Sequence, residues 1–281
     1  MEQIKRSIPK QTRSDNVKTS ISGTIEKALD VLFHLHEAGS PLGVTTIART
    51  LGMPKSSVHR LLSTLARREL VEQNERGQYQ IGVGLMALGL GVLAREPVAV
   101  AAHPVLERAA AEVGETFFLV VARAGRLIVL DKAEGNGFLR AAPQVGTSVP
   151  VHATAVGKLY LLHAPEQVQL AGALMENHPS KNKQVFETAQ LPRYTDNTLI
   201  EWSDLQCELE RVRRQGWASN LDEWQSGLSV LAAPVLLGTR LLGAVALALV
   251  SPRLQELGLQ TLAQRVVYAA EGIALRLEGK K

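Results

Sequence analysis

The chain has a single cysteine, few aromatic residues and no long hydrophobic run. With Cys207 alone among 281 residues, an intramolecular disulfide and a metal site built from several cysteines are excluded. Pro234 and the turn at residues 238–240 divide the apolar stretch 228–250, so no segment reaches the roughly 18 apolar residues that span a bilayer. The basic N-terminus lacks the apolar segment of a secretory signal. We therefore expect a cytoplasmic protein with no membrane partner, no metal and no cofactor.

Charge is distributed unevenly along a chain long enough for two domains. Hydrophobic residues make up 46 % and charged residues 21 % of the sequence, which indicates a globular protein with a sizeable core. Residues 1–96 hold 13 Lys and Arg against 9 Asp and Glu, whereas residues 97–281 hold 18 of each. The whole positive excess lies in the N-terminal third, and such a field favours a phosphate-bearing partner there.

Residues 40–82 have the order of elements typical of a winged helix-turn-helix. A short predicted helix ends at Gly52, and a second begins near Pro54, because a missing N–H costs little at the first helical position. A two-stranded ribbon follows, with its turn at residues 74–77. In such a module the second helix enters the major groove of double-stranded DNA.

The second of these helices divides into a buried and an exposed face. Its buried stripe follows the i, i+3, i+4, i+7 pattern and consists of Val58, Leu61, Leu62 and Leu65. The other face, which includes Ser63, carries cations and hydroxyls that suit phosphate oxygens and base edges. An ordinary solvated helix has the same periodicity, but the adjoining turn and ribbon favour DNA binding. The residues expected to contact DNA are Lys55, Ser56, Ser57, His59, Arg60, Thr64 and, in the ribbon, Arg76.

We expect four consecutive parts. Residues 1–20 form a polar, basic and disordered arm of the kind that is usually only solvated. Residues 21–82 form the DNA-binding domain, residues 83–96 a linker and dimerisation helix, and residues 97–281 the second domain. The linker helix is apolar and contains Gly84, Gly89 and Gly91, each costing about 1 kcal/mol of helix stability. Close packing against another helix would offset that cost, as in a dimer that reads a two-fold DNA site.

The second domain alternates predicted strands and helices. We expect helices over residues 102–113, 155–163, 203–215 and 254–277, with Ser203 as the cap of the third. We expect strands over residues 116–122, 127–132, 138–142, 216–220, 230–236 and 242–250. Tight turns between the strands indicate an antiparallel-rich sheet covered by helices, and the fold class of the whole chain is α+β.

Four segments, in this order and spacing, resemble the IclR family of bacterial transcription regulators. They are residues 53–62 (MPKSSVHRLL), residues 79–82 (YQIG), residues 150–158 (PVHATAVGK) and the stretch 220–227. The likeness runs from about residue 24 to residue 277. It implies an N-terminal winged helix-turn-helix, a linker helix and a C-terminal GAF-like α/β effector domain. It also implies a homodimer or homotetramer bound to double-stranded operator DNA.

The segment 149–158 has the features of a small-molecule site. It leaves a predicted strand, passes through small residues and opens a helix, whose free N–H groups favour a carboxylate, carbonyl or hydroxyl. A plain strand-to-helix turn has the same features. We interpret His152 and Lys158 as structural residues.

The resemblance points to the rest of the effector pocket, where this chain departs from the family pattern. Relatives that bind small oxo-acids carry Asp at the position of Asn220, a polar or thiol residue at Val230, and serines at Ala248 and Val250. The implied pocket is less polar, so the expected effector is apolar or aromatic, with Asn220 as a donor. The expected effector-binding residues are Phe138, Ala141, Val149, Ala155, Val156, Asn220, Leu228, Val230, Ala248 and Val250.

Two other functions compete with an effector-controlled regulator. In an enzyme with a fused DNA-binding domain, the polar candidates would be Asp131, His152, Lys158, Asp222 and Glu223. They match no nucleophile elbow, metal-ligand set or phosphate loop, so we expect no catalytic residues. A constitutive DNA-binding protein without an effector would not need the large, neutral second domain.

Overall fold

The computed structural model describes residues 23–137, 143–170, 173–174, 184–185 and 191–279. It divides into two compact units, Met1–Gly91 and Val92–Lys281, and each is described by itself. No single helix in these ranges is long and apolar enough to cross a membrane, and only the bent pair α4 (Val83–Leu93) and α5 (Pro97–Val113) passes that test together.

The N-terminal unit is a three-helix module with a two-stranded wing. Its elements are α1 (Gly23–Ala38), α2 (Val44–Thr50), α3 (Lys55–Ala66), β1 (Val71–Gln73) and β2 (Tyr79–Ile81). Val31, Ile47, Val58 and Leu62 form its fully buried core, so the stripe predicted on the second helix faces inward. The antiparallel wing is joined to the body by backbone hydrogen bonds in both directions between Leu42 and Tyr79.

Helix α4 (Val83–Leu93) has no buried residue in the described chain. Its start is close-packed, because a Cβ on Gly84 would lie 2.9 Å from the carbonyl oxygen of Glu69. Gly89 and Gly91 have open space beside them. Of the three glycines in α4, therefore, only Gly84 is closely packed within one chain, and it packs against the turn after α3 rather than against another helix.

The C-terminal unit is built on a six-stranded antiparallel sheet with the order β5-β4-β3-β10-β9-β8. The strands are β3 (Thr116–Arg123), β4 (Arg126–Ala133), β5 (Ser148–Val149), β8 (Ala218–Leu221), β9 (Leu228–Leu237) and β10 (Arg240–Val250). Two-residue turns join β3 to β4 and β9 to β10, and both use positive φ angles, at Ala124, Gly125 and Gly238.

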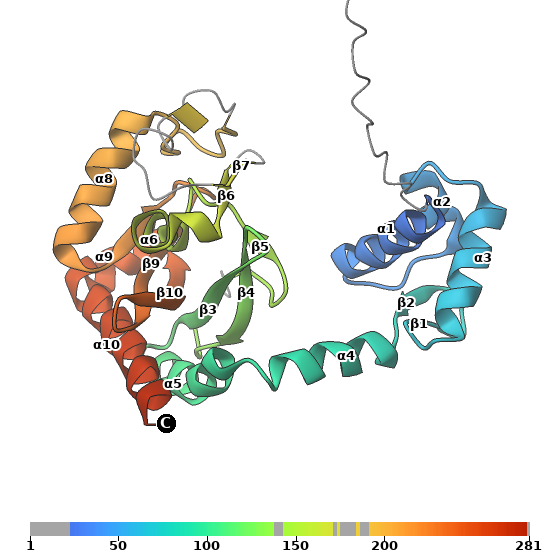
Figure 1. Cartoon of the computed structure of the whole chain (residues 1–281), viewed down its shortest axis with the longest axis horizontal. Coiled ribbons are helices and arrows are strands. Elements are labelled where there is room, and N and C mark those ends of the chain that lie inside the picture. The colour runs from blue at the N-terminus through green and yellow to red at the C-terminus, as the bar shows by residue number, and fades with distance from the viewer. Residues whose placement is uncertain (1–22, 138–142, 171–172, 175–183, 186–190, 280–281) are drawn as a thin grey trace, which may run out of the picture. The chain divides into compact units, whose positions relative to one another are not determined.

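Helices cover both faces of this sheet (Figure 1). One face packs against α6 (Ala155–His163) and α8 (Trp202–Gln215). The other packs against α5 (Pro97–Val113), α9 (Ser251–Leu257) and α10 (Leu259–Glu278). Neighbouring residues on one strand therefore enter different cores, as Phe117 and Phe118 do on β3. The short elements η1 (Pro165–Gln167), β6 (Gln169–Leu170) and β7 (Ala173–Leu174) lie between α6 and α8 in sequence.

Three predicted helices have different bounds in the structure. The single helix expected over residues 254–277 is two helices, because Gly258 between them has a φ of 84°. The helix expected at residue 102 begins at Pro97, since proline is well suited to a first helical position. Ser203 is not a cap, because α8 already begins at the buried Trp202. The strand expected over residues 138–142 falls outside the described residues.

Candidate functional site

The exposed side of α3 carries most of the predicted DNA-contacting residues. Lys55, Ser56, His59, Arg60 and Thr64 are exposed, whereas Ser57 is half-buried. The Thr64 hydroxyl donates to the Arg60 carbonyl at 2.9 Å, so its proton is already used within the helix.

These residues form two rows along α3. Ser57, Arg60 and Thr64 border a groove of about 540 Å³ between α3 and α1. Ser56, His59 and Ser63 lie on the open side, at i, i+3 and i+7. Arg60 therefore lies on the part of the helix between the groove and the open row.

The wing turn is held by the side chain of Asn74. Its Oδ1 accepts hydrogen bonds from the backbone N–H groups of Arg76 and Gln78, each at 3.0 Å, and Gly77 completes the turn with a φ of 74°. The Arg76 side chain is exposed at this tip, and no ion pair in the described ranges involves it. Both features leave its charge available to a partner.

Three of the predicted effector-binding residues lie side by side on the sheet. Asn220 on β8 pairs with Val230 on β9, and Val230 pairs with Ala248 on β10. All three are buried, and Val230 and Ala248 belong to the core that packs against α6. The next pair on the same face of the sheet is Leu228 with Val250, of which Val250 is half-buried.

Helix α6 contributes two more of the predicted residues, the buried Ala155 and Val156. Its cap is Thr154, whose Oγ1 accepts from the N–H of Gly157 at 3.1 Å. A Cβ on Gly157 would lie 1.8 Å from the Val151 carbonyl oxygen, so only glycine permits this close turn before the helix. In the parts of the chain that the structure describes, the N–H groups of Ala155 and Val156 have no hydrogen-bond partner.

The remaining predicted residues are not beside this row. Val149 lies on β5, at the opposite edge of the sheet from β8, although it shares the same core. It also lines a cavity of about 320 Å³ together with His152 and Tyr194, whose rings stack. Phe138 and Ala141 lie outside the described residues.

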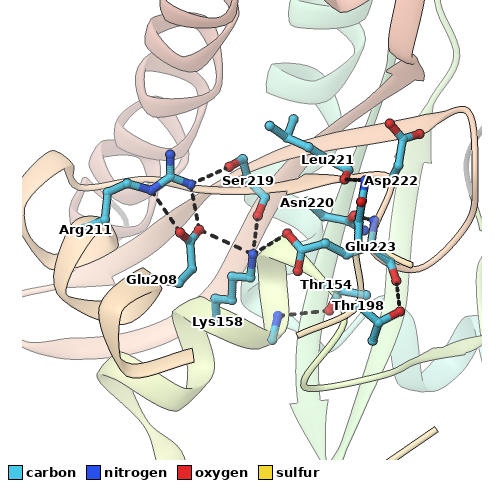
Figure 2. Close-up of polar contacts among 12 residues, drawn as sticks. Thr154, Lys158, Thr198, Glu208, Arg211, Ser219, Asn220, Leu221, Asp222 and Glu223 are labelled. Atoms are coloured by element: carbon cyan, nitrogen blue, oxygen red, sulfur yellow. Dashed lines mark hydrogen bonds and ion pairs between the residues drawn. The ribbon is translucent and has the colours of Figure 1, made fainter. Parts of the chain in front are cut away.

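A buried polar network, centred on Lys158, ties α6 to the end of β8 (Figure 2). The Lys158 Nζ lies 2.6 Å from Glu223 Oε1, 2.7 Å from the Ser219 carbonyl oxygen and 3.3 Å from Glu208 Oε1. Arg211 then binds both oxygens of Glu208, at 2.9 and 2.8 Å. The lysine predicted to be structural is 1 % exposed and contacts the residues on either side of the β8 end.

The loop after β8 is fixed from the other side by residues 195–198. The Thr198 hydroxyl donates to the Glu223 carbonyl at 2.7 Å, and the Thr195 hydroxyl donates to the Asp222 carbonyl at 2.6 Å. Asp222 has a φ of 60°, and its Oδ1 accepts from the N–H of Gly227 at 2.6 Å. Side chains from three segments thus determine the path of this loop.

Two buried polar atoms in this region have no hydrogen-bond partner among the described residues. They are Asn220 Nδ2 and Glu223 Oε2. The other end of the Asn220 amide is satisfied, because its Oδ1 accepts from the N–H of Glu223 at 2.7 Å. An unpaired buried donor is costly, and native proteins usually provide it with a partner or a ligand.

The protonation of these groups follows from their surroundings. Burial raises the pKa of the Glu223 carboxyl, although Lys158 opposes that shift. Burial alone would raise the pKa of Glu208 as well, but the hydrogen bonds from Arg211 and the charge on Lys158 lower it overall. Burial lowers the pKa of His152, whose Nε2 lies 3.0 Å from the Pro192 carbonyl oxygen.

Sequence reasoning missed Ser219, Glu208 and Thr198 as parts of this site. Glu208 and Arg211 are three residues apart on an amphipathic helix, a pattern that usually marks a solvent-exposed pair. A buried lysine signals the need for carboxylates nearby, but it does not identify which ones in the sequence supply them.

Comparisons with known proteins match two domains, in this order along the chain. The family model described as the IclR helix-turn-helix domain matches residues 24–75, and the one described as the bacterial transcriptional regulator IclR C-terminal matches residues 90–275. The chain is 28 % identical over 259 residues to the HTH-type transcriptional regulator BhcR of Paracoccus denitrificans, covering 92 % of this chain and 88 % of BhcR. It is 28 % identical over 254 residues to the regulator XynR of Escherichia coli, covering 90 % and 95 % of the two chains.

Solved structures share the same fold. An IclR transcriptional regulator from Alicyclobacillus acidocaldarius superposes with a TM-score of 0.74 at 24 % identity, covering 92 % of this chain and 99 % of that one. An IclR homologue from Microbacterium hydrocarbonoxydans, solved in complex with 4-hydroxybenzoate, superposes with a TM-score of 0.76 at 21 % identity, covering 92 % and 100 %. With both domain models matched in order across most of its length, the chain belongs to the IclR family of bacterial transcriptional regulators.

Proposed function

We propose that this regulator binds double-stranded operator DNA through α3 and the wing, and that a small-molecule effector in the C-terminal unit controls operator affinity. The observation that carries the effector proposal is the row Asn220, Val230 and Ala248, buried on the α6 face of the sheet with one amide donor unpaired. An effector changes DNA affinity only by binding the DNA-competent and DNA-free states unequally.

The DNA contacts divide into base-reading and phosphate-binding residues. Ser56 and His59 on the open row of α3, with Arg60 beside them, offer donors and acceptors to base edges, and Lys55, Ser57 and Thr64 lie at the margins. Arg76 at the wing tip is assigned to a phosphate. The positive excess of the N-terminal third supports the same assignment.

We assign the effector to the apolar or aromatic class. Val230 and Ala248 offer only hydrocarbon next to Asn220, so the pocket rewards apolar contact area and uses few hydrogen bonds. The complex of the Microbacterium homologue with 4-hydroxybenzoate supports an aromatic ligand in this fold. Glyoxylate-like oxo-acids fit this surface less well.

We propose a homodimer or homotetramer in which α1 and α4 supply apolar contacts. On α1, Ile25 and Phe33 are both 62 % exposed. On α4, the exposed apolar residues are Val83, Met86, Leu88, Leu90 and Val92. A monomer would expose these apolar side chains to water. Exposed apolar surface of this kind marks a site where another protein chain binds.

DNA binding is tested with duplexes selected by the parent protein from a random-sequence library. Arg60→Ala should cost about 1–3 kcal/mol and relax specificity at one position. Arg76→Ala should weaken binding to all sequences and reduce the salt slope by about one unit. Arg240→Ala, which removes an exposed arginine from the start of β10, is the matched control. Parent-like binding by both variants across a salt series would exclude this DNA-binding face.

The effector site is tested by filling it from α6. Ala155→Val should weaken effector binding without changing operator affinity in the absence of effector, because Ala155 is completely buried on that face. Ala263→Val places the same extra carbon atoms in the other helical layer and is the control. With 4-hydroxybenzoate and glyoxylate as probes, the aromatic compound should bind more tightly and shift operator affinity. Tight binding of glyoxylate alone would contradict the apolar class.

A further inference from the structure

The end of β3 is held by a side chain from α6. The pairing of β3 with β10 ends at Val120, where β10 has a bulge. Two residues further along, the N–H of Ala122 donates to the hydroxyl of Tyr160 at 3.0 Å. Tyr160 is 1 % exposed and belongs to the core between the sheet and α6. Because a buried N–H is costly to leave unpaired, this contact ties the end of β3 to α6.

Arg123 continues the connection from the end of β3 to the segment before α5. Its Nη1 donates to the Ala122 carbonyl at 2.8 Å, and its Nη2 lies 2.5 Å from Glu96 Oε2. Ala122 is thus bound by α6 through its N–H and by Arg123 through its carbonyl. A series of hydrogen bonds therefore leads from Tyr160 through Ala122 and Arg123 to Glu96, and we call it the Tyr160–Glu96 path.

Glu96 belongs to the joint between α4 and α5, which consists of residues 94–96. Its N–H donates at 3.0 Å to the carbonyl of Leu93, the last residue of α4. Its own carbonyl accepts from the N–H groups of Ala99 and Val100, at 3.1 and 3.2 Å, as the first turn of α5 forms. One residue thus makes the last contact of the linker helix and the first contact of α5, while its carboxylate binds the end of β3.

The other end of the path lies on the helix that opens the proposed effector site. Val156 and Tyr160 are four residues apart on α6, so they are neighbours on successive turns of one face, and both are buried in the same core. A ligand that shifts the first turn of α6 therefore shifts the Tyr160 hydroxyl against β3.

The Arg123–Glu96 pair is too exposed to contribute much to global stability. Its side chains are 51 % and 23 % exposed, and ion pairs at such positions contribute little. A second pair, between Arg265 of α10 and Glu112 near the other end of α5, is similarly exposed, at 54 % and 49 %. The second pair offers a matched control on the same helix, because it binds α5 to α10 instead of to β3.

We propose that the Tyr160–Glu96 path couples the effector face of α6 to the joint, and that Arg123 is a positioning residue that determines how strongly an effector changes operator affinity. The inference rests on the effector control proposed above. It also makes a claim that needs no ligand, since breaking the path at α6 should loosen the joint.

The first measurement uses the full-length protein without ligand or DNA. Hydrogen exchange is followed by mass spectrometry on a peptide that covers residues 95–101, because the N–H groups of Ala99 and Val100 donate to Glu96. Tyr160→Phe and Arg123→Gln should each speed this exchange at least ~5-fold, as expected for a lost hydrogen bond that opens a local structure. Tyr268→Phe, at an exposed tyrosine of α10, and Arg265→Gln are the controls and should leave the exchange unchanged.

A double variant shows whether the two residues act on the joint together. Tyr160→Phe combined with Arg123→Gln should speed exchange no more than the stronger single variant, whereas independent effects would multiply. Arg123 is half exposed, so Arg123→Gln still decides the question if Tyr160→Phe does not fold.

The second measurement is operator affinity with and without 4-hydroxybenzoate. Arg123→Gln should reduce the ligand-induced change in operator affinity at least ~3-fold, and Arg265→Gln should not alter it. The affinity of the DNA-free protein for 4-hydroxybenzoate should stay within ~2-fold of the parent in both variants, because neither residue belongs to the proposed ligand site. A merely structural role for Arg123 would leave the ligand-induced change intact.

The outcomes separate this inference from the proposed function. The inference is overturned if exchange in residues 95–101 is parent-like in Arg123→Gln, if the control variants speed it equally, or if Arg123→Gln responds to 4-hydroxybenzoate as the parent does. If exchange changes as expected but operator affinity of the parent does not respond to 4-hydroxybenzoate, the path from α6 to the joint is supported and effector control by this ligand fails.

Discussion

Lys158 on α6 and Glu223 after β8 form a buried ion pair, with Nζ and Oε1 2.6 Å apart. The pair joins a helix to a loop 65 residues away in sequence, and Lys158 is 1 % exposed. It therefore contributes to the position of the loop that follows β8, next to Asn220, and the energetics of the pair can be measured separately from ligand binding.

Removing one partner of this pair should be strongly destabilising. Lys158→Met leaves Glu223 buried without its counter-charge, and we expect a loss of about 3–5 kcal/mol in the free energy of unfolding, measured with urea. The double variant Lys158→Met with Glu223→Gln should recover part of this loss. Arg213→Met breaks an exposed pair on α8 and should cost less than about 1 kcal/mol. Equal losses from Lys158→Met and Arg213→Met would contradict the buried pair.

Stability should fall on mild acidification because of His152. Burial lowers its pKa below the ordinary value of 6.5, so the unfolded chain takes up the proton more readily than the folded one. The contribution of neutral His152 to the free energy of unfolding is complete above about pH 7 and declines as the pH falls below about 6.5. His152→Gln should flatten the unfolding free energy between about pH 7.5 and 5.5. His163 is more exposed to solvent, and partial burial of its ring together with the charge of Arg213 lowers its pKa. His163→Gln should therefore flatten the unfolding free energy less than His152→Gln.

The glycines of α4 should respond differently to alanine. Gly84→Ala should destabilise the junction with α3, because its Cβ would lie 2.9 Å from a backbone oxygen of Glu69. Gly89→Ala meets open space, so it should strengthen the helix by about 0.5–1 kcal/mol. Hydrogen exchange of residues 83–93 measures both effects. A slowing of exchange in both variants would show that the contact at Gly84 is unimportant.

The dimer contact on α4 should be sensitive to charge. Met86→Glu with Leu90→Glu places two charges one turn apart on the exposed apolar face and should lower the sedimentation mass of the protein. Ala94→Glu, just beyond the helix, is the control. A parent protein that sediments only as a monomer, with and without DNA, would rule out this interface.

Trp224 should be the fluorescent reporter of effector binding. It packs against the core beneath α6, on the face that carries Val230, whereas Trp217 belongs to the core on the opposite face of the sheet. Trp224→Phe should remove most of the ligand-dependent quenching, and Trp217→Phe should leave it. The reverse result would place the ligand on the α5 and α10 side. Both tryptophans flank Asn220 in sequence, so the two variants separate the two faces of the sheet.

The elements predicted from sequence are those whose signals are local. The stripe of α3, the turn at residues 74–77 and the tight turn between β3 and β4 each depend on residues within a few positions. The structure confirms the two turns and buries Val58, Leu62 and Leu65 of the stripe, whereas Leu61 is half-buried. The break at Gly258 was missed because apolar residues continue with helical spacing on both sides of it. A glycine inside a long predicted helix was the available signal.

The candidate site depends on contacts between distant segments, which the sequence pattern could not supply. The alignment of Asn220, Val230 and Ala248 follows from strand register, and the role of Thr198 depends on where an irregular segment crosses the β8 end. The family resemblance indicated which residues to compare. It did not indicate that the Asn220 amide is held in one orientation by Glu223.

The position of β10 in the sheet has a consequence for biosynthesis. This strand lies between β3 and β9, although it is the last to leave the ribosome. The sheet therefore closes only after residues 240–250 are made, whereas the DNA-binding unit is complete long before, and domains fold in the order of synthesis. A chain that stops before Arg240 would retain a folded DNA-binding unit and lose the sheet that is proposed to control it. Premature stop codons in this region should therefore produce DNA-binding fragments that no effector can regulate.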